Sequence, residues 1–220
     1  MNTLVLYGHP FSSYTWKALI AFYENGTPFD FRALGPDHPE NEAELERRWP
    51  LKKFPVLVDG EHFVPEASIV IEHLAVHYPG PVTLIPNDAD ASVEARMLDR
   101  FFDNYVMTPV QKIVGDALRP EGARDQHGVA EARAQLDTAY QILDRWMVTR
   151  EWAAAGQFSL ADCAAAPSLF YADWVHPITD GLTNAKAYRA RLLARASVAR
   201  AVDEARPYRH FFPLGAPDRD

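Results

Sequence analysis

Cysteine is almost absent from this chain of 220 residues, because Cys163 is the only one. A single cysteine excludes an internal disulfide framework. Basic residues are also in the minority, with 22 Lys and Arg against 30 Asp and Glu and a formal net charge of −8 at pH 7. Since no stretch concentrates lysine and arginine, we expect no nucleic-acid partner and no attraction to anionic membrane surfaces.

Long apolar runs are missing as well. No run approaches the roughly 18 residues that a membrane-spanning helix needs. The opening MNTLVLYGHP has neither the basic start nor the apolar length of a signal peptide. We therefore expect a cytoplasmic protein without a membrane partner. Hydrophobic residues make up 48% of the chain and charged residues 24%, a composition that permits a globular core.

What the first eighty residues do contain is an alternation of strand and helix patterns. Leu4–Tyr7 has the composition of a short buried strand, and in the next segment Leu19, Phe22 and Tyr23 fall on one helical face. An Asn-Gly pair then stops that helix. The alternation in FDFRA predicts a second strand, which completes a βαβ unit with parallel strands.

The rest of this region predicts a hairpin between two helices. PENEAELERRW is typical of a short exposed helix. PVLV and EHFV are strand-like, and we expect Asp59-Gly60 between them to form a two-residue turn. Val70, Leu74 and Tyr78 then recur every four residues, as on a helix. The predicted order is β-α-β-α-β-β-α, with parallel and antiparallel pairs in one mixed sheet.

The pattern changes at YPGPVTLIPNDADA, where three prolines and a glycine interrupt all periodicity and mark a linker. No convincing strand follows. We expect Pro109 to bend the first helix of the second region and Pro167 to disturb the third. The predicted fold class is α/β plus all-α, with a small α/β domain at 1–80, a linker at 81–91 and an all-helical domain at 92–220. The predicted helices are 92–118, 125–151, 160–174 and 184–205.

Two helix N-termini carry the residues of chemical interest. Ser12 stands in a loop crowded with hydroxyls just before the first helix, and Glu66 and Ser68 stand in the first turn of the helix after the hairpin. Helix capping explains such residues. The alternative is anion binding, because the free N–H groups and the dipole make a helix N-terminus electropositive.

Between these helices, LKKFPVL begins a strand with Pro55. A trans proline entering a strand is the simpler interpretation. A cis proline would instead turn the backbone of Phe54 outward, toward a peptide-like ligand. Two helix N-termini flanking a strand that starts with proline favour an amino-acid-like anion as the ligand.

The motif FSLADC in the helical region favours a structural interpretation. Ser159 and Asp162 have the spacing of a capping box, and Phe158 and Cys163 are placed as its hydrophobic staple. We therefore expect Cys163 to be a buried structural thiol. His73 and His77 have the i, i+4 spacing of metal ligands, but without a third ligand in the pattern we expect no metal.

The segments YGHPFSSYTWKA, WPLKKFPVLVDG, PEASIVIEHL and FSLADC resemble, in order and spacing, the glutathione S-transferase superfamily, in a bacterial-type form with a serine in the first loop. The resemblance covers about residues 3–206. It implies a thioredoxin-like N-terminal domain that binds glutathione, an all-helical C-terminal domain, no metal and a homodimer. It also implies a small hydrophobic electrophile as the second substrate.

The resemblance assigns glutathione contacts residue by residue. Pro55 matches the family's cis proline, and Phe54 the residue whose backbone pairs with the cysteinyl part of glutathione. Lys53 matches a lysine near the glycyl end.

Glu66 matches the residue that meets the γ-glutamyl group. Ala67 departs from the family, which usually has serine at that position, and Ser68 follows one place on. Backbone contacts survive this change, but a lost hydroxyl contact to a carboxylate weakens binding by roughly 1.5–3 kcal/mol if nothing compensates.

For the group that holds the glutathione sulfur as a thiolate, the resemblance favours Ser12, with Tyr7, Tyr14 and Ser13 as alternatives. The first loop lacks the cysteine that a thiol–disulfide exchange enzyme would carry there. The expected activity is that of a glutathione transferase. The alternatives are a glutathione-dependent isomerase or dehalogenase, and a binding module that has lost the reaction. Phe102, Tyr105 and Trp174 are more typical of a core than of an electrophile pocket.

Overall fold

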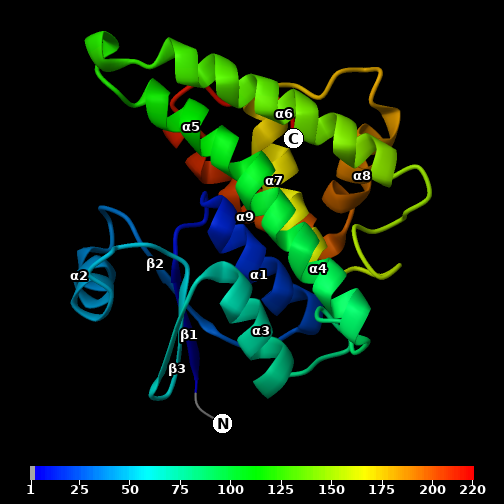
Figure 1. The fold of residues 1–220 in the computed structure, drawn as a ribbon. Coiled ribbons are helices and arrows are strands. Elements are labelled where there is room, and N and C mark those ends of the chain that lie inside the picture. The colour runs from blue at the N-terminus through cyan, green and yellow to red at the C-terminus, as the bar shows by residue number, and fades with distance from the viewer. Residues whose placement is uncertain (1–2) are drawn as a thin grey trace.

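The computed structural model describes residues 3–220, and within them a four-stranded sheet is followed by a helical bundle (Figure 1). This arrangement confirms the predicted fold class. The strand order is β2-β1-β3-β4, in which β1 and β2 are parallel and the other neighbouring pairs are antiparallel. The strands are β1 (Leu4–Gly8), β2 (Asp30–Ala33), β3 (Val56–Asp59) and β4 (His62–Pro65), and the helices of this region are α1 (Ser13–Asn25), α2 (Pro39–Arg48) and α3 (Ala67–His77).

The alternation along the strands separates two apolar layers. Leu4 and Leu6 of β1 and Leu57 of β3 join the large core that α1 and α3 cover. Tyr7 and Val56 face the other way and pack with residues of α2 and its flanks. Accordingly α2 lies on the side of the strands away from α1 and α3 (Figure 1). The sheet is therefore covered on both faces, and its ends are left to build a site.

The helical region packs around one central helix. Every residue of α7 from Leu160 to Trp174 is buried, including Pro167. α7 packs against α1, so the core runs on from the N-terminal region without a break. The helices here are α4 (Ala89–Phe101), α5 (Thr108–Ala117), α6 (Gln126–Trp146), α7 (Leu160–Val175), α8 (Thr183–Leu193) and α9 (Ala196–Ala205), with a π-helical turn at Phe102–Met107 and short 3₁₀ turns at Glu121–Ala123 and Arg206–Phe211.

The predicted capping box lies at the start of α7, deep in this core. Asp162 accepts hydrogen bonds from the amides of Ser159 and Ala153, both at 2.9 Å, and from the Tyr188 hydroxyl at 2.7 Å. Burial raises the pKa of the Asp162 carboxyl, although these donors act in the opposite direction. One carboxylate thus joins the start of α7, the preceding loop and α8.

Several predicted boundaries were wrong. The hairpin turn is Gly60-Glu61 rather than Asp59-Gly60, because Asp59 still pairs with His62 and the left-handed φ of +58° falls on Gly60. The first helix of the second region starts at 89 rather than 92, and α6 ends at 146 rather than 151. The predicted helix 92–118 is three pieces, because the π turn precedes Pro109. The predicted helix 184–205 is two, α8 and α9.

Candidate active site

A cleft of about 550 Å³ lies between the sheet region and the helical region. A larger, mostly apolar cavity of about 830 Å³ lies between α4 and α6 and contains none of the predicted site residues. We place the candidate site in the smaller cleft, because its walls bring the two helix N-termini and the proline loop together. Its lining residues are Ser12, Tyr14, Trp49, Lys52, Lys53, Phe54, Pro55, Glu66, Ala67, Arg100, Asp103, Asn104 and Gln111.

The loop before α1 is fixed by aromatic side chains from below and from the bundle. The Trp16 indole donates to the Pro10 carbonyl at 2.6 Å, and the Tyr171 hydroxyl of α7 donates to the Phe11 carbonyl at 2.8 Å. Both aromatic residues are buried. The position of Ser12 therefore depends on the helical region as well as on its own strand and helix.

Ser12 caps α1 and faces the cleft at the same time. Its backbone is extended, with φ −91° and ψ 128°, and its Oγ accepts a hydrogen bond from the Thr15 amide at 3.3 Å. No acceptor within residues 3–220 takes its hydroxyl proton. Capping and anion binding are thus compatible, since the oxygen serves the helix and the O–H group stays free to donate into the cleft.

The alternative hydroxyls lie in different surroundings. Tyr14 lines the cleft beside Ser12. Burial, followed by the charge of Asp103, raises its pKa, so its phenol stays protonated. Tyr7 is buried between the sheet and α2 and does not line the cleft. Ser13 lines a small neighbouring space with Lys17 rather than the cleft itself. The geometry therefore leaves Ser12 and Tyr14 as the hydroxyls that can reach a ligand.

The proline loop forms the wall beneath α3. The Phe54–Pro55 peptide bond is cis, and both residues line the cleft. Lys53 is exposed beside them. Lys52 has a left-handed φ of +53° and its ammonium pairs with Glu46 at 2.8 Å. Left-handed backbone is unfavourable for a residue with a side chain and is concentrated at functional sites.

A second left-handed residue stands at the start of α3. Glu66 has φ +72°, is exposed, and makes no side-chain cap. Ala67 follows as the first helical residue and is buried against the cleft. Ser68 does not line the cleft, because its hydroxyl points into a cluster of charged groups. At this position the wall therefore offers the backbone of the helix start and the Glu66 carboxylate.

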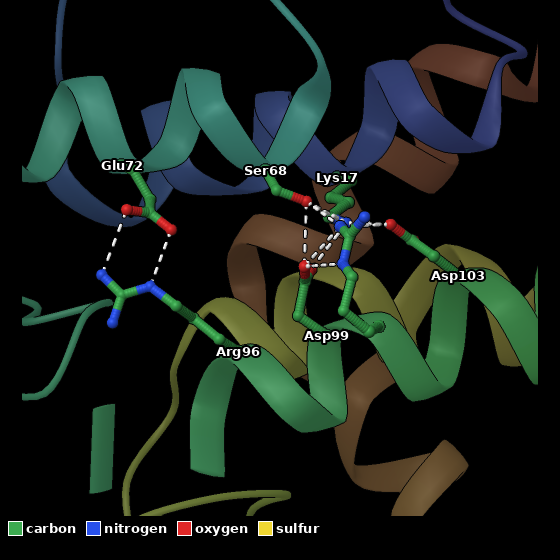
Figure 2. Close-up of polar contacts among 7 residues, drawn as sticks. Lys17, Ser68, Glu72, Arg96, Asp99 and Asp103 are labelled. Atoms are coloured by element: carbon green, nitrogen blue, oxygen red, sulfur yellow. Dashed lines mark hydrogen bonds and ion pairs between the residues drawn. The ribbon is translucent and has the colours of Figure 1, made fainter. Parts of the chain in front are cut away.

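That cluster was not predicted, and it joins the two regions behind the cleft (Figure 2). Lys17 of α1 is 1% exposed at its side chain, and its Nζ lies 2.6 Å from Asp99 and 2.7 Å from Asp103. The same ammonium donates to Ser68 at 2.8 Å, and Ser68 donates to Asp99 at 2.9 Å. Arg100 adds ion pairs to both aspartates.

The charges of this buried ion cluster (Lys17, Ser68, Asp99, Arg100 and Asp103) nearly cancel. Two cations face two carboxylates, which offsets the desolvation of each. Burial raises the pKa of Asp103, although Lys17 opposes this. Nearer the surface, Arg96 of α4 pairs with Glu72 of α3 at 2.9 Å (Figure 2). Since Lys17 follows Ser12 by little more than one turn, the cluster fixes both helix N-termini against α4.

Other candidate residues lie away from the cleft. Phe102 and Trp174 are buried in the core, and Tyr105 is 61% exposed next to the larger cavity. Cys163 is fully buried, and burial raises its thiol pKa well above the ordinary value. His73 does not stand ready as a free ligand, because its Nε2 lies 3.0 Å from Asp59 Oδ2.

Two searches over the part of the chain that the structure describes complete the picture. Among residues 3–220, no group of three or more His, Cys, Asp and Glu is arranged to hold a metal ion. None of the helices in the same range has both the length and the apolar character to span a membrane.

Comparison with known proteins follows the same division of the chain. Residues 6–82 match the family model for the N-terminal domain of glutathione S-transferase, and residues 99–196 match the model for its C-terminal domain. Together the two matches cover well over half of the sequence.

Individual relatives match over nearly full length. A probable maleylacetoacetate isomerase of Vibrio cholerae is 26% identical over 94% of this chain and 99% of its own. Glutathione S-transferase theta-1 of Bos taurus is 29% identical over 82% of this chain and 76% of its own. A crystal structure of a glutathione S-transferase from Methylobacterium radiotolerans in complex with glutathione sulfonate has a TM-score of 0.78 and 27% identity, over 91% of this chain and 94% of its own.

Proposed function

The chain belongs to the glutathione S-transferase superfamily, and from that premise we propose that it activates glutathione as a thiolate for attack on a small electrophile, with Ser12 as the hydrogen-bond donor to the sulfur. The observation that carries this proposal is the free hydroxyl of Ser12 at the N-terminus of α1, facing a cleft between the two regions. A hydrogen bond and the positive end of a helix both favour a thiolate over a thiol.

The remaining walls of the cleft complement the other groups of glutathione. We assign the glycyl carboxylate to Lys53, the γ-glutamyl ammonium to Glu66 and the γ-glutamyl carboxylate to the backbone at Ala67 and Ser68, where α3 begins. The peptide part lies along Phe54 and Pro55. The Ser68 hydroxyl is engaged in the ion cluster, so we assign it no side-chain contact with the ligand.

The proposed reaction is a displacement or addition by sulfur. The glutathione thiol loses its proton to solvent on binding, and the sulfur lone pair forms the new bond to the electrophilic carbon. The leaving group departs with its bonding electrons, or in an addition the former double bond takes up a proton. Ser12 donates to the sulfur anion and releases it as the new bond forms, so it is not a nucleophile. Trp49, Phe54 and the ring of Tyr14 offer apolar surface for a hydrophobic electrophile.

A second candidate function is glutathione-dependent isomerisation. It is favoured by the match to the probable maleylacetoacetate isomerase, which extends over nearly the whole of both chains. In an isomerisation the same thiolate adds to the substrate and is expelled again, so glutathione is not consumed. A binding module without a reaction is the third candidate, and the loss of serine at Ala67 is compatible with it.

Counting glutathione separates these candidates. With purified protein and a panel of electrophiles, loss of one glutathione per product indicates transfer, and product formation at constant glutathione indicates isomerisation. We expect transfer. Glutathione binding without any turnover, or the absence of glutathione binding, would refute the enzymatic proposal.

We also propose that the chain acts as a homodimer in the cytoplasm. In support of the dimer, exposed apolar side chains lie on the adjoining helices α3 and α4, namely Ile69, Val76, Val93 and Met97, the last on the wall of the larger cavity. Light scattering on the eluting protein should give twice the monomer mass of 24.8 kDa. The Met97→Glu variant should shift the eluting mass toward the monomer.

A further inference from the structure

The wall that the helical region contributes to the cleft is entirely polar. Its lining residues are Arg100, Asp103, Asn104 and Gln111. The opposite wall, from the sheet region, holds the groups that we assigned to glutathione. An electrophile held against the glutathione sulfur therefore lies between an apolar floor and a hydrogen-bonding wall.

Two of these four side chains are already engaged. The Asp103 carboxylate pairs with Lys17 and Arg100, each at 2.7 Å, and the Arg100 guanidinium also pairs with Asp99 at 2.6 Å. Asn104 and Gln111 are exposed, and within residues 3–220 neither side-chain amide makes a hydrogen bond. Their amide groups are therefore the ones that remain to meet a second substrate.

The π-helical turn places these amides along the cleft. Pro109 has no N–H group, and its ring crowds the carbonyl one turn earlier, so a regular α-helix cannot pass through it undisturbed. The helix widens just before it, with the Thr108 amide bonded to the Asp103 carbonyl, five residues back, and the Thr108 hydroxyl bonded to the same carbonyl at 3.0 Å. Asp103 points into the ion cluster, and Asn104 lines the cleft. Such widened turns within α-helices are frequent at functional sites.

We propose that Asn104 and Gln111 select the second substrate, and that the preferred electrophile carries a carbonyl group, as in an amide, a ketone or a carboxylic acid, beside its reactive carbon. This inference rests on the proposed function. A side-chain amide offers both N–H donors and a C=O acceptor, and a carbonyl compound can satisfy both. A wholly apolar electrophile would remove water from these amides and return no hydrogen bond, which is unfavourable.

Two glutathione conjugates of equal size test this preference without any need for turnover. S-(carbamoylmethyl)glutathione and S-isobutylglutathione differ only in an amide group against an isopropyl group. Their dissociation constants, and that of glutathione itself, are measured by titration calorimetry on the full chain. We expect the carbamoylmethyl conjugate to bind about tenfold more tightly than the isobutyl conjugate.

Three variants assign the preference to residues. The double variant Asn104→Leu, Gln111→Met should bring the two conjugates within about twofold of each other. Gln111→Met alone should remove part of the preference, and it leaves the larger cavity untouched because Gln111 does not line that cavity. The matched control is Gln141→Met, an exposed position on α6 outside both cavities, and it should keep the full preference.

The outcomes separate this inference from its premise. If glutathione does not bind at all, both the proposed function and the inference fail. If glutathione binds and the isobutyl conjugate binds as tightly as the carbamoylmethyl conjugate or more tightly, only the inference fails. A preference that survives the double variant, or that disappears equally in Gln141→Met, refutes the assignment to Asn104 and Gln111.

Discussion

Replacing Lys17 by methionine should destabilise the protein far more than a typical surface substitution. Methionine keeps most of the length of the apolar side chain and removes the ammonium that lies 2.6 Å from Asp99 and 2.7 Å from Asp103. Both carboxylates are almost completely shielded from water. Arg100 still faces them, but its guanidinium is half exposed, so it cannot compensate fully.

The expected magnitude follows from burial. Removing one partner of a buried ion pair costs about 3–5 kcal/mol, because the remaining charge stays buried without compensation. For a chain of this length, about 1 kcal/mol shifts the melting temperature by roughly 2–4 °C. We therefore expect Lys17→Met to melt roughly 6–20 °C below the unsubstituted protein.

The assay is thermal unfolding followed by circular dichroism, together with a matched control. Lys186→Met makes the same substitution at an exposed ion pair with Asp180, where the expected loss is about 0–1 kcal/mol. The double variant Lys17→Met, Asp103→Asn should recover part of the lost stability, since it removes one of the two stranded charges. The reasoning is refuted if Lys17→Met and Lys186→Met melt within about 2 °C of each other.

Three further predictions concern acid stability, the start of α7 and the start of α1. Burial alone would raise the pKa of Asp59, but hydrogen bonds from His73 and Tyr78 outweigh it and hold that pKa below its ordinary 3.8. The stabilisation is therefore complete above pH 3.8 and disappears as the pH falls through the lowered value, so urea midpoints of His73→Leu and the unsubstituted protein should differ at pH 6 and converge near pH 2. Asp162→Ala leaves four donated hydrogen bonds without their acceptor in the core and should cost more than about 4 kcal/mol; a melting temperature within a few degrees of the original contradicts this. Gly8→Ala brings a Cβ within 2.7 Å of the Thr15 side chain and should displace the start of α1, so calorimetry should show several-fold weaker glutathione binding, whereas unchanged affinity would show that this helix start tolerates the shift.

Local patterns were sufficient to predict the sheet region. The alternation in FDFRA and the apolar spacing of α1 are properties of single segments, and the observed strand and helix order agrees with them. The hairpin was placed correctly to within one residue. The error arose because Asp59 and Gly60 are both typical turn residues, and only strand pairing decides that Asp59 belongs to β3.

Contacts between distant segments decided the features that were missed. The break between α8 and α9 contains neither glycine nor proline. It falls where Arg195 pairs with Glu24 of α1 at 2.5 Å and lies over the Phe158 ring, 3.9 Å from its centroid. Lys17 likewise looks like an ordinary helix-surface lysine in the sequence, and its burial depends on two aspartates more than eighty residues away.

The candidate site shows the same division. Ser12, Phe54 and Glu66 were singled out by local motifs, and the structure brings all three to one cleft. Ser68 was predicted to contact glutathione, but its hydroxyl is oriented toward α4 by partners that no local motif reveals. Asn104 and Gln111 carried no signal at all, because a polar residue on a helix is normally a solvated one.

The most direct test of the account is an ultraviolet titration of the glutathione thiolate with and without the protein, in the unsubstituted form and as Ser12→Ala. Lowering the thiol pKa by about 2 units requires about 2.7 kcal/mol. A hydroxyl hydrogen bond to an anion contributes about 1.5–3 kcal/mol, and the helix N-terminus contributes about 0.3–1 kcal/mol. We predict that bound glutathione ionises about 2 units below its free pKa and that Ser12→Ala restores at least one of those units. Ionisation of bound glutathione at its free pKa, or a lowered pKa that Ser12→Ala leaves unchanged, would contradict the account.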